Sequence, residues 1–319
     1  MSKKNKLLKL GRLVSGDGIG VIAFSSPIES SRLERGLSAL RERGFAVKVA
    51  LQPSAEYGKT TYLFGSDSVS ARAKAFGEML EDPEVKVILA ARGAYGSLEL
   101  LPYLDFSALT ANPKAIVGFS DVTCILLAAY ERAGVTVIHG PSLDSCVAKI
   151  GVSKEAARSF SALLELLEGR EINPFRGMTF NRLCGSERGE GPLIGGNLSL
   201  LSSLMGTPWE PNFDGHILFW EEVAEKPYRL DRMLVQMKLA GKFDHLQGVV
   251  VGYLSRCEHA QGLGPSAVDV IKNVFKDFDF PVLSGVPFGH ELLNLPLPIG
   301  IHASIAGNSF ELVESPVAL

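Results

Sequence analysis

The chain has 319 residues, 46% of them hydrophobic, and carries a net charge of −3 at pH 7 with its basic residues scattered. This length allows a large core and predicts two domains, and the charge gives no indication of nucleic acid or an anionic membrane as a partner. No window approaches the roughly 20 apolar residues of a membrane span. Lys9 and Arg12 interrupt the N-terminal apolar stretch, so no signal peptide is expected. Four widely spaced cysteines without a CxxC pair are typical of a reduced, cytoplasmic protein.

The first half of the chain alternates short β-branched runs with amphipathic runs of helical length. The runs that predict strands lie at residues 20–24, 45–49, 85–90, 115–119 and 135–138. The runs that predict helices lie at residues 29–43, 68–80, 124–132 and 155–167. This alternation predicts an α/β domain over residues 1–168, with a wound parallel sheet of the flavodoxin type covered by helices on both faces. Functional residues of such sheets lie past the carboxyl ends of the strands, where we expect Ser25, Arg92 and Ser120.

The second half of the chain is richer in strand signals. Residues 169–191 mix glycine, proline, asparagine and charged residues without periodicity, and are predicted to be a linker. Residues 192–319 are predicted to form a smaller, mixed α/β domain. Its expected strands lie at residues 217–220, 246–253 and 299–305, and its expected helices at residues 230–239 and 265–275.

The segment Gly118-Phe119-Ser120-Asp121 joins an apolar run to a helical run, which predicts Ser120 at a tight strand-to-helix corner. Such a corner holds a hydroxyl clear of the sheet, beside the unpaired N–H groups and positive dipole end of a helix. The pattern is similar to the nucleophile elbow of Gly-x-Ser-x-Gly hydrolases, with Val122 in the place of the second glycine. The alternative interpretation is that Ser120 or Asp121 caps a helix.

A nucleophilic serine needs a base, and among the six histidines His290 stands in a loop dense in glycine and proline, residues 285–300. His302 alternates with apolar residues inside a predicted strand and is interpreted as structural. His139 follows a strand and precedes Gly140-Pro141, which fits either a packed residue or a substrate contact.

An orienting acid is available at the end of another predicted strand, where Glu221 and Glu222 follow each other. Adjacent strand residues face opposite sides, so only one of the two can point into a given site. A solvated strand end is the alternative. No HExxH motif and no close group of His, Cys and Asp has ligand spacing, so no metal site is expected.

Two glycine-rich segments lie near the predicted strand ends. Residues 92–97 follow a strand and can present backbone N–H groups to an oxyanion or a phosphate. Residues 195–197, Gly-Gly-Asn, predict a close approach of two backbones. Neither segment matches a dinucleotide or P-loop pattern, so no nucleotide cofactor is predicted.

Taken together and in order, these segments resemble the LD-carboxypeptidase family, serine peptidase family S66, which also contains the microcin C7 self-immunity peptidases. The resemblance covers nearly the whole chain. Its matching motifs are Gly16-Asp17, residues 92–96, residues 118–121, residues 139–141, residues 195–197, residues 218–222, residues 227–232, Gly289-His290 and residues 297–300.

The resemblance implies a Ser–His–Glu triad in which Ser120 is the nucleophile, His290 the general base and Glu221 the acid that orients it. It places the N–H of Asp121 and the turn formed by Arg92, Gly93 and Ala94 at the oxyanion hole. Arg92 is also a candidate for the carboxylate of the substrate, with a structural ion pair as the alternative.

The implied reaction is hydrolysis of an L–D peptide bond, releasing terminal D-Ala from a murein tetrapeptide in the cytoplasm. The implied partner is therefore a small muropeptide, with no metal or other cofactor, no nucleic acid and no membrane, and the implied assembly is a homodimer.

The sequence departs from the family pattern at Ala94, where glycine is usual, and at Glu291, where a small residue or threonine is common. A positive φ would strain Ala94 by about 1 kcal/mol or more. Glu291 is expected to affect substrate fit or the protonation of the preceding histidine.

Two other functions are open. A self-immunity peptidase for a peptidyl-nucleotide needs aromatic surfaces for a base, and the chain has two tryptophans, Trp209 and Trp220. A non-catalytic binding protein on the same scaffold is the second alternative, against which the presence of all three triad residues argues.

Overall fold

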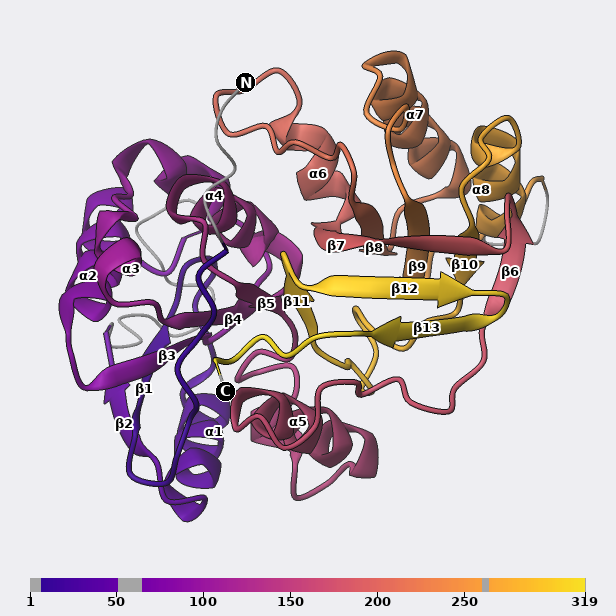
Figure 1. Ribbon diagram of the computed structural model, residues 1–319. Coiled ribbons are helices and arrows are strands. Elements are labelled where there is room, and N and C mark those ends of the chain that lie inside the picture. Colours follow the sequence, from indigo (N-terminus) through magenta and orange to yellow (C-terminus); the bar gives the residue numbers. More distant parts are fainter. Residues whose placement is uncertain (1–6, 51–64, 260–263, 319) are drawn as a thin grey trace.

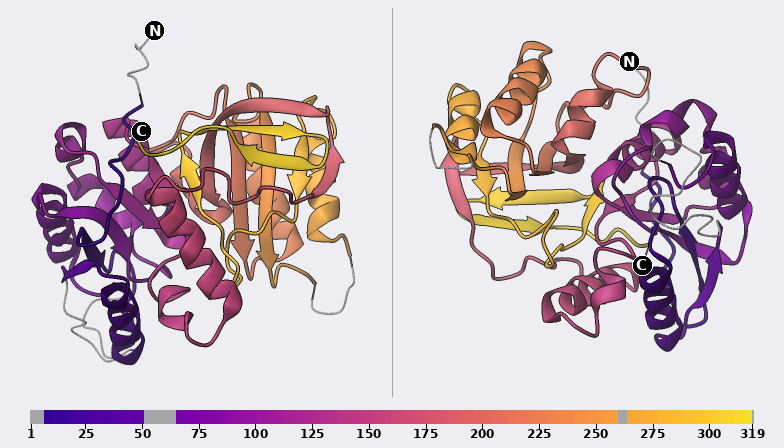
Figure 2. Two further views of the ribbon diagram at one scale, coloured as in Figure 1. Left: turned by 60° about the horizontal axis from the view of Figure 1, so that its bottom comes forward. Right: turned by 180° about the vertical axis from the view of Figure 1, so that it is seen from behind.

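Two β-sheets with flanking helices make up the α/β fold that the sequence predicts (Figure 1). The structure is a computed structural model and describes residues 7–50, 65–259 and 264–318. The residues around Leu10, near the N-terminus, run beside those around Val317, near the C-terminus, because Leu10 and Val317 form a parallel bridge (Figure 2). Among the described residues, no helix is both long and apolar enough to span a bilayer.

The first sheet has six strands in the order β11-β5-β4-β3-β1-β2. Strands β1 to β5 are parallel in the order 2-1-3-4-5, which confirms the predicted flavodoxin type. Strand β11 pairs antiparallel with β5 at the edge of the sheet. The strands are β1 (Gly18–Ile22), β2 (Ala46–Val49), β3 (Val85–Ala90), β4 (Ala115–Gly118), β5 (Val137–His139) and β11 (Leu297–Ile299).

The helices of this half follow from hydrophobic spacing and from capping side chains. α1 buries Leu33, Leu37 and Leu40 along one face, and Ser68 caps α2 by accepting the N–H of Ala71. Gly134 ends α4 in the left-handed conformation. The helices are α1 (Ser30–Glu42), α2 (Val69–Glu81), α3 (Ser107–Ala111), α4 (Thr123–Ala133) and α5 (Lys154–Leu167), with short 3₁₀ turns η1 (Leu98–Tyr103), η2 (Ser120–Val122) and η3 (Val147–Lys149).

The second sheet is mixed, as predicted, with seven strands in the order β13-β12-β7-β8-β9-β10-β6. Strands β7 to β10 are parallel, and the outer strands β6, β12 and β13 are antiparallel to their neighbours. Figure 1 shows α6, α7 and α8 together along one face of this sheet. The elements are β6 (Asn181–Cys184), β7 (Arg188–Asn197), α6 (Leu198–Leu204), β8 (Ile217–Val223), α7 (Pro227–Leu239), β9 (Gly248–Ser255), α8 (Ala267–Phe275), β10 (Val282–Ser284), β12 (His302–Ala306) and β13 (Ser309–Leu312).

Two features of the second half differ from the sequence-based expectation. The predicted linker, residues 169–191, contains β6 and the start of β7, while the domain boundaries themselves remain a prediction. The single strand predicted over residues 299–305 is two strands, because Gly300, with φ +88°, turns the chain between β11 and β12. As a result, a short strand of the C-terminal half completes the sheet of the N-terminal half.

Candidate active site

Ser120 lies at the corner between β4 and α4, past the carboxyl end of its strand, with a φ of +60°. A non-glycine residue held there is strained by about 1 to 2 kcal/mol, a feature that clusters at functional sites. A Cβ on Gly118 would lie 2.9 Å from Cγ1 of Val122. The valine that replaces the second glycine of the hydrolase pattern therefore packs directly over the first one.

Ser120, His290 and Glu221 form one hydrogen-bonded chain. The Nε2 atom of His290 lies 3.0 Å from Oγ of Ser120, and its Nδ1 atom lies 2.5 Å from Oε2 of Glu221. Because the carboxylate accepts, Nδ1–H is the donor, and in the neutral imidazole Nε2 is then the acceptor for the serine hydroxyl. The Glu221 side chain is fully buried and that of His290 is 19% exposed. The structure thus joins residues far apart in the sequence and from both sheets.

Burial and the neighbouring carboxylate shift the pKa of His290 in opposite directions. Burial lowers its pKa, but the charge of Glu221 and the hydrogen bond to it outweigh burial, so the pKa lies above the ordinary histidine value of 6.5. Gly289, with φ +112°, permits this contact, because a Cβ there would lie 2.8 Å from Cβ of Glu221. The second carboxylate oxygen of Glu221 accepts a hydrogen bond from Nδ2 of Asn197 at 3.2 Å.

Glu222 faces a different environment from Glu221, as the strand alternation predicts. It accepts from the backbone N–H and the hydroxyl of Ser199, at 2.8 and 2.7 Å, and from Nδ2 of Asn197 at 2.9 Å. Burial raises its pKa above the ordinary glutamate value in spite of these donors. Asn197 therefore donates to both carboxylates, a contact that sequence analysis missed although it had singled out the Gly-Gly-Asn segment.

The glycine-rich turn after β3 lies against the serine. A Cβ on Gly93 would sit 3.1 Å from Cβ of Ser120, and Ala94 has a φ of +87°, the strained conformation considered for this position. The buried side chain of Asp121 stabilises this turn. It accepts hydrogen bonds from Ser25 Oγ at 2.6 Å and from the N–H of Ser97 at 2.7 Å. The corner that carries Ser120 and the turn that carries Gly93 are thereby held together.

A pocket of about 500 Å³ opens beside Ser120 and His290 and is lined from both halves of the chain. Arg92, Lys149 and Arg256 line it, together with the carboxylates of Asp144 and Glu291. Arg92 is engaged by the protein, because Nη1 donates to the carbonyl of Pro27 at 3.1 Å and Nε lies 3.7 Å from Oδ2 of Asp144.

Glu291, Lys149 and Arg256 line the pocket in different ways. Oε1 of Glu291 accepts from Ser255 Oγ at 2.6 Å. Lys149 and Arg256 lie outside every motif, so their sequence context does not predict a place in the pocket. The positive φ of Arg256, +59°, appears only in the folded backbone.

His139 is a packed residue. It is fully buried, its ring lies 5.3 Å from that of Phe219, 5.7 Å from that of Phe288 and 6.0 Å from that of Phe119, and burial lowers its pKa to about 4. His302 lies in strand β12, as expected. Within residues 7–50, 65–259 and 264–318, no group of three or more His, Cys, Asp or Glu side chains is placed to hold a metal ion.

Two family models match the chain, the LD-carboxypeptidase N-terminal domain over residues 19–140 and the LD-carboxypeptidase C-terminal domain over residues 190–305. The chain therefore belongs to the LD-carboxypeptidase family, which includes murein tetrapeptide carboxypeptidases and the self-immunity protein MccF.

Individual relatives match over most of their length. The chain is 32% identical to the probable murein peptide carboxypeptidase of Bacillus subtilis, over 92% of this chain and 90% of that protein. It is 29% identical to the microcin C7 self-immunity protein MccF of Escherichia coli, over 92% of this chain and 91% of that protein. Among solved structures, MccF in complex with glutamyl sulfamoyl guanosine matches with a TM-score of 0.86 at 25% identity, over 98% of this chain and 100% of that one.

Proposed function

We propose that this protein is a serine LD-carboxypeptidase that hydrolyses the bond between an L-centred residue and a terminal D-Ala of a murein tetrapeptide. The observation that carries the proposal is the hydrogen-bonded chain Ser120–His290–Glu221 beside a pocket. A hydroxyl, a neutral imidazole and a buried carboxylate in this order have the parts of nucleophilic catalysis on a carbonyl. The same contacts argue against a non-catalytic binding protein.

In the proposed mechanism, Nε2 of His290 takes the proton of Ser120 as Oγ attacks the carbonyl carbon of the L residue. Glu221 stabilises the imidazolium that forms. The negative oxygen of the tetrahedral intermediate receives the N–H of Asp121 and an N–H of the turn at Gly93 and Ala94. A single such donor contributes about 3 to 4 kcal/mol. The C–N bond then breaks, and His290 protonates the leaving amine of D-Ala.

In the second half of the reaction, hydrolysis of the acyl-enzyme regenerates the free enzyme. A water molecule gives a proton to Nε2 of His290 and attacks the ester carbonyl of the acyl-enzyme, after which Ser120 Oγ leaves and recovers that proton. A free carboxylate on the leaving residue requires a cation in the pocket. Arg92 and Arg256 are the candidates, and Arg256 is the exposed one of the two.

A muropeptide suits the pocket better than a peptidyl-nucleotide. Among the described residues, the aromatic side chains that line the pocket are Phe119 and His290. Trp220 is buried in the core, and Trp209 packs under Arg132 at 4.8 Å, where it lines a different cavity. Neither tryptophan offers the flat surface that a base would stack on. The likeness to MccF, whose structures hold aminoacyl sulfamoyl nucleosides, makes that substrate class the alternative to test.

The test is release of D-Ala from a purified murein tetrapeptide, followed by mass spectrometry. We expect one alanine to be lost with the unaltered protein and with Ser203→Ala, an exposed serine on α6, and none with Ser120→Ala. A tetrapeptide with a D-centred third residue should resist. Release by Ser120→Ala would refute the role of the serine. Cleavage of aspartyl sulfamoyl adenosine in place of the tetrapeptide would establish the alternative.

The proposal includes a cytoplasmic location and a homodimer, both implied by the family resemblance. Light scattering on the purified protein measures the mass of the assembly directly, and a mass of one chain at assay concentration would refute the homodimer. Fractionation of cells that express the protein tests the cytoplasmic location.

A further inference from the structure

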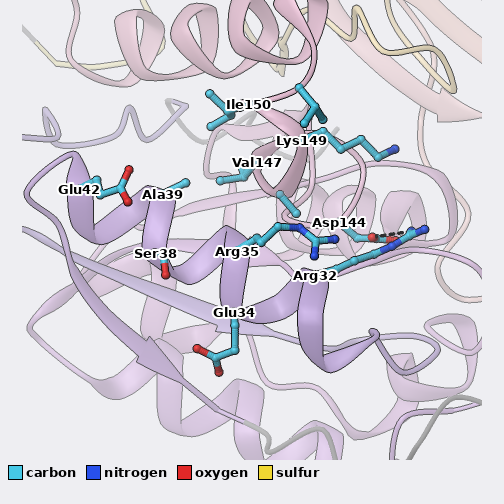
Figure 3. A pocket seen from close by; sticks show the side chains of 13 residues that line it. Arg32, Glu34, Arg35, Ser38, Ala39, Glu42, Asp144, Val147, Lys149 and Ile150 are labelled. Carbon is cyan, nitrogen blue, oxygen red and sulfur yellow. Dashed lines mark hydrogen bonds and ion pairs between the residues drawn. The ribbon is translucent and has the colours of Figure 1, made fainter.

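A groove of about 840 Å³ lies between α1 and the segment around η3, and Figure 3 shows the side chains that line it. Asp144 and Lys149 line both cavities, so the groove and the pocket meet at these two residues. Its walls carry apolar side chains as well, among them Ala39, Val147 and Ile150. The groove is larger than the pocket in which the reaction takes place.

The end of the groove beside the pocket is cationic. Figure 3 shows Arg35 on α1 and Lys149 on η3 extending from opposite sides toward the end where Arg32 and Asp144 lie, with Glu34 pointing away. Asp144 is already paired, at 2.9 Å with Nη1 of Arg32 and at 3.7 Å with Nε of Arg92. Within the described part of the chain, neither Arg35 nor Lys149 forms an ion pair. Two cations without an ion pair therefore face this end of the groove, while Glu42 lies at its other end.

The proposed reaction determines which part of a substrate can reach the groove. A carboxypeptidase has a single residue on the leaving side of the attacked bond, so any longer stretch of substrate lies on the acyl side. The groove exceeds the pocket in volume and joins it directly. The acyl side of the peptide is thus the part with the length to enter it.

We propose that this groove is a second subsite, in which Arg35 and Lys149 bind a carboxylate carried by the residue that precedes the attacked one. A free carboxylate pairs well with guanidinium and ammonium donors, and charge complementarity of this kind selects among peptides. This inference rests on the proposed function and adds its substrate class, an acidic peptide in preference to its amidated counterpart.

The experiment compares two peptides that differ at one group, L-Ala-γ-D-Glu-L-Lys-D-Ala and the same peptide with the free carboxylate of D-Glu converted to a carboxamide. The proteins are the wild type, Arg35→Met, Lys149→Met, the double variant, and Arg41→Met. Arg41 is a matched control, since it is an exposed arginine in the last turn of α1 that lines neither cavity.

We expect the wild type to favour the acidic peptide about three- to tenfold in kcat/KM, with the difference in KM, because the groove acts on binding. Each single variant should reduce this preference and the double variant should abolish it, while Arg41→Met keeps it. The same preference in the double variant and the wild type would overturn the inference.

A calorimetric titration separates the two proposals. It measures the Kd of the tripeptides that lack D-Ala, with and without the carboxylate, and needs no turnover. A preference for the acidic tripeptide that the double variant loses supports the subsite even if no D-Ala is released, in which case the proposed reaction alone fails. Equal affinities of the two tripeptides for the wild type would overturn the subsite, whatever the activity.

Discussion

The protonation of His290 is set by a buried carboxylate on one side and by burial on the other. Since Glu221 raises the pKa of His290 above 6.5, and since only the neutral imidazole accepts the proton of Ser120, activity must fall as the pH drops through that raised value. We predict an acid limb of kcat/KM with its midpoint above 6.5. In Glu221→Gln, burial acts without the opposing charge, so the midpoint moves to lower pH, while kcat falls by about 10³- to 10⁴-fold.

The matched control for this profile is Glu222→Gln. Glu222 also raises the pKa of His290, but only through its charge, without the hydrogen bond that Glu221 makes. Its substitution should move the acid limb less than Glu221→Gln does and in the same direction. The measurement is a pH series of initial rates for the three proteins. An acid limb at the same pH in Glu221→Gln and the wild type would contradict the assigned hydrogen bond.

At the scale of an element, the turn after β3 carries a strained alanine. Ala94 is exposed and has a φ of +87°, so its Cβ adds strain and no packing. We predict that Ala94→Gly raises the free energy of unfolding by about 1 kcal/mol. Ala73→Gly, at a partly exposed position inside α2, should lower it by a similar amount. Urea unfolding measures both changes, and the same sign for the two would show that Ala94 is not strained.

The elements that sequence analysis identified are those with a strong local pattern. Strands β1 to β5 and helices α1, α2, α4 and α5 have β-branched or amphipathic runs, and the structure has them within a few residues of the predicted bounds. Strand β7 was missed throughout, since residues 169–191 were assigned to a linker and residues 195–197 to a close approach of two backbones, and Gly189 and Gly191 carry no strand signal. Their place in the sheet comes from pairing with β12, and a Cβ on Gly189 would lie 2.0 Å from the carbonyl oxygen of Gln247. Such a strand depends on partners distant in the sequence.

In the candidate site, too, the residues in local motifs could be predicted from the sequence and those outside motifs could not. Ser120 and His290 stand in motifs whose residue types point to their chemistry, and the choice of Glu221 over its neighbour came from the family resemblance. Lys149 and Arg256 belong to no motif, and their proximity to the pocket arises from the way η3 and the end of β9 meet the first sheet. Charge on a surface loop has no signature in sequence that separates a ligand contact from a solvated residue.

At the scale of the whole molecule, the hydrogen-bonded chain depends on how the two sheets pack. The end of β7 touches the start of α4, where the N–H of Asn197 donates to Oγ1 of Thr123 at 3.0 Å. Gly196 makes this approach possible, because a Cβ there would lie 2.3 Å from Cγ2 of Thr123. Ser120 lies three residues before Thr123, and Glu221 pairs in register with Asn197 across β7 and β8. One glycine thus sets the distance between the elements that carry the serine and the acid.

We therefore predict that Gly196→Ala separates these elements and lowers kcat/KM about 100-fold, a loss typical of a displacement of roughly 1 Å between reacting groups. The free energy of unfolding should fall by about 2 kcal/mol or more, from overpacking and from a φ of +151°. Gly206→Ala is the matched control, because Gly206 has a φ of +76° but nothing within 4 Å of an added Cβ. It should lose about 1 kcal/mol of stability and keep its activity. Rates and urea unfolding of the two variants, measured together, decide the point: a folded Gly196→Ala protein with unchanged kcat/KM would mean that the packing of the two sheets tolerates this displacement.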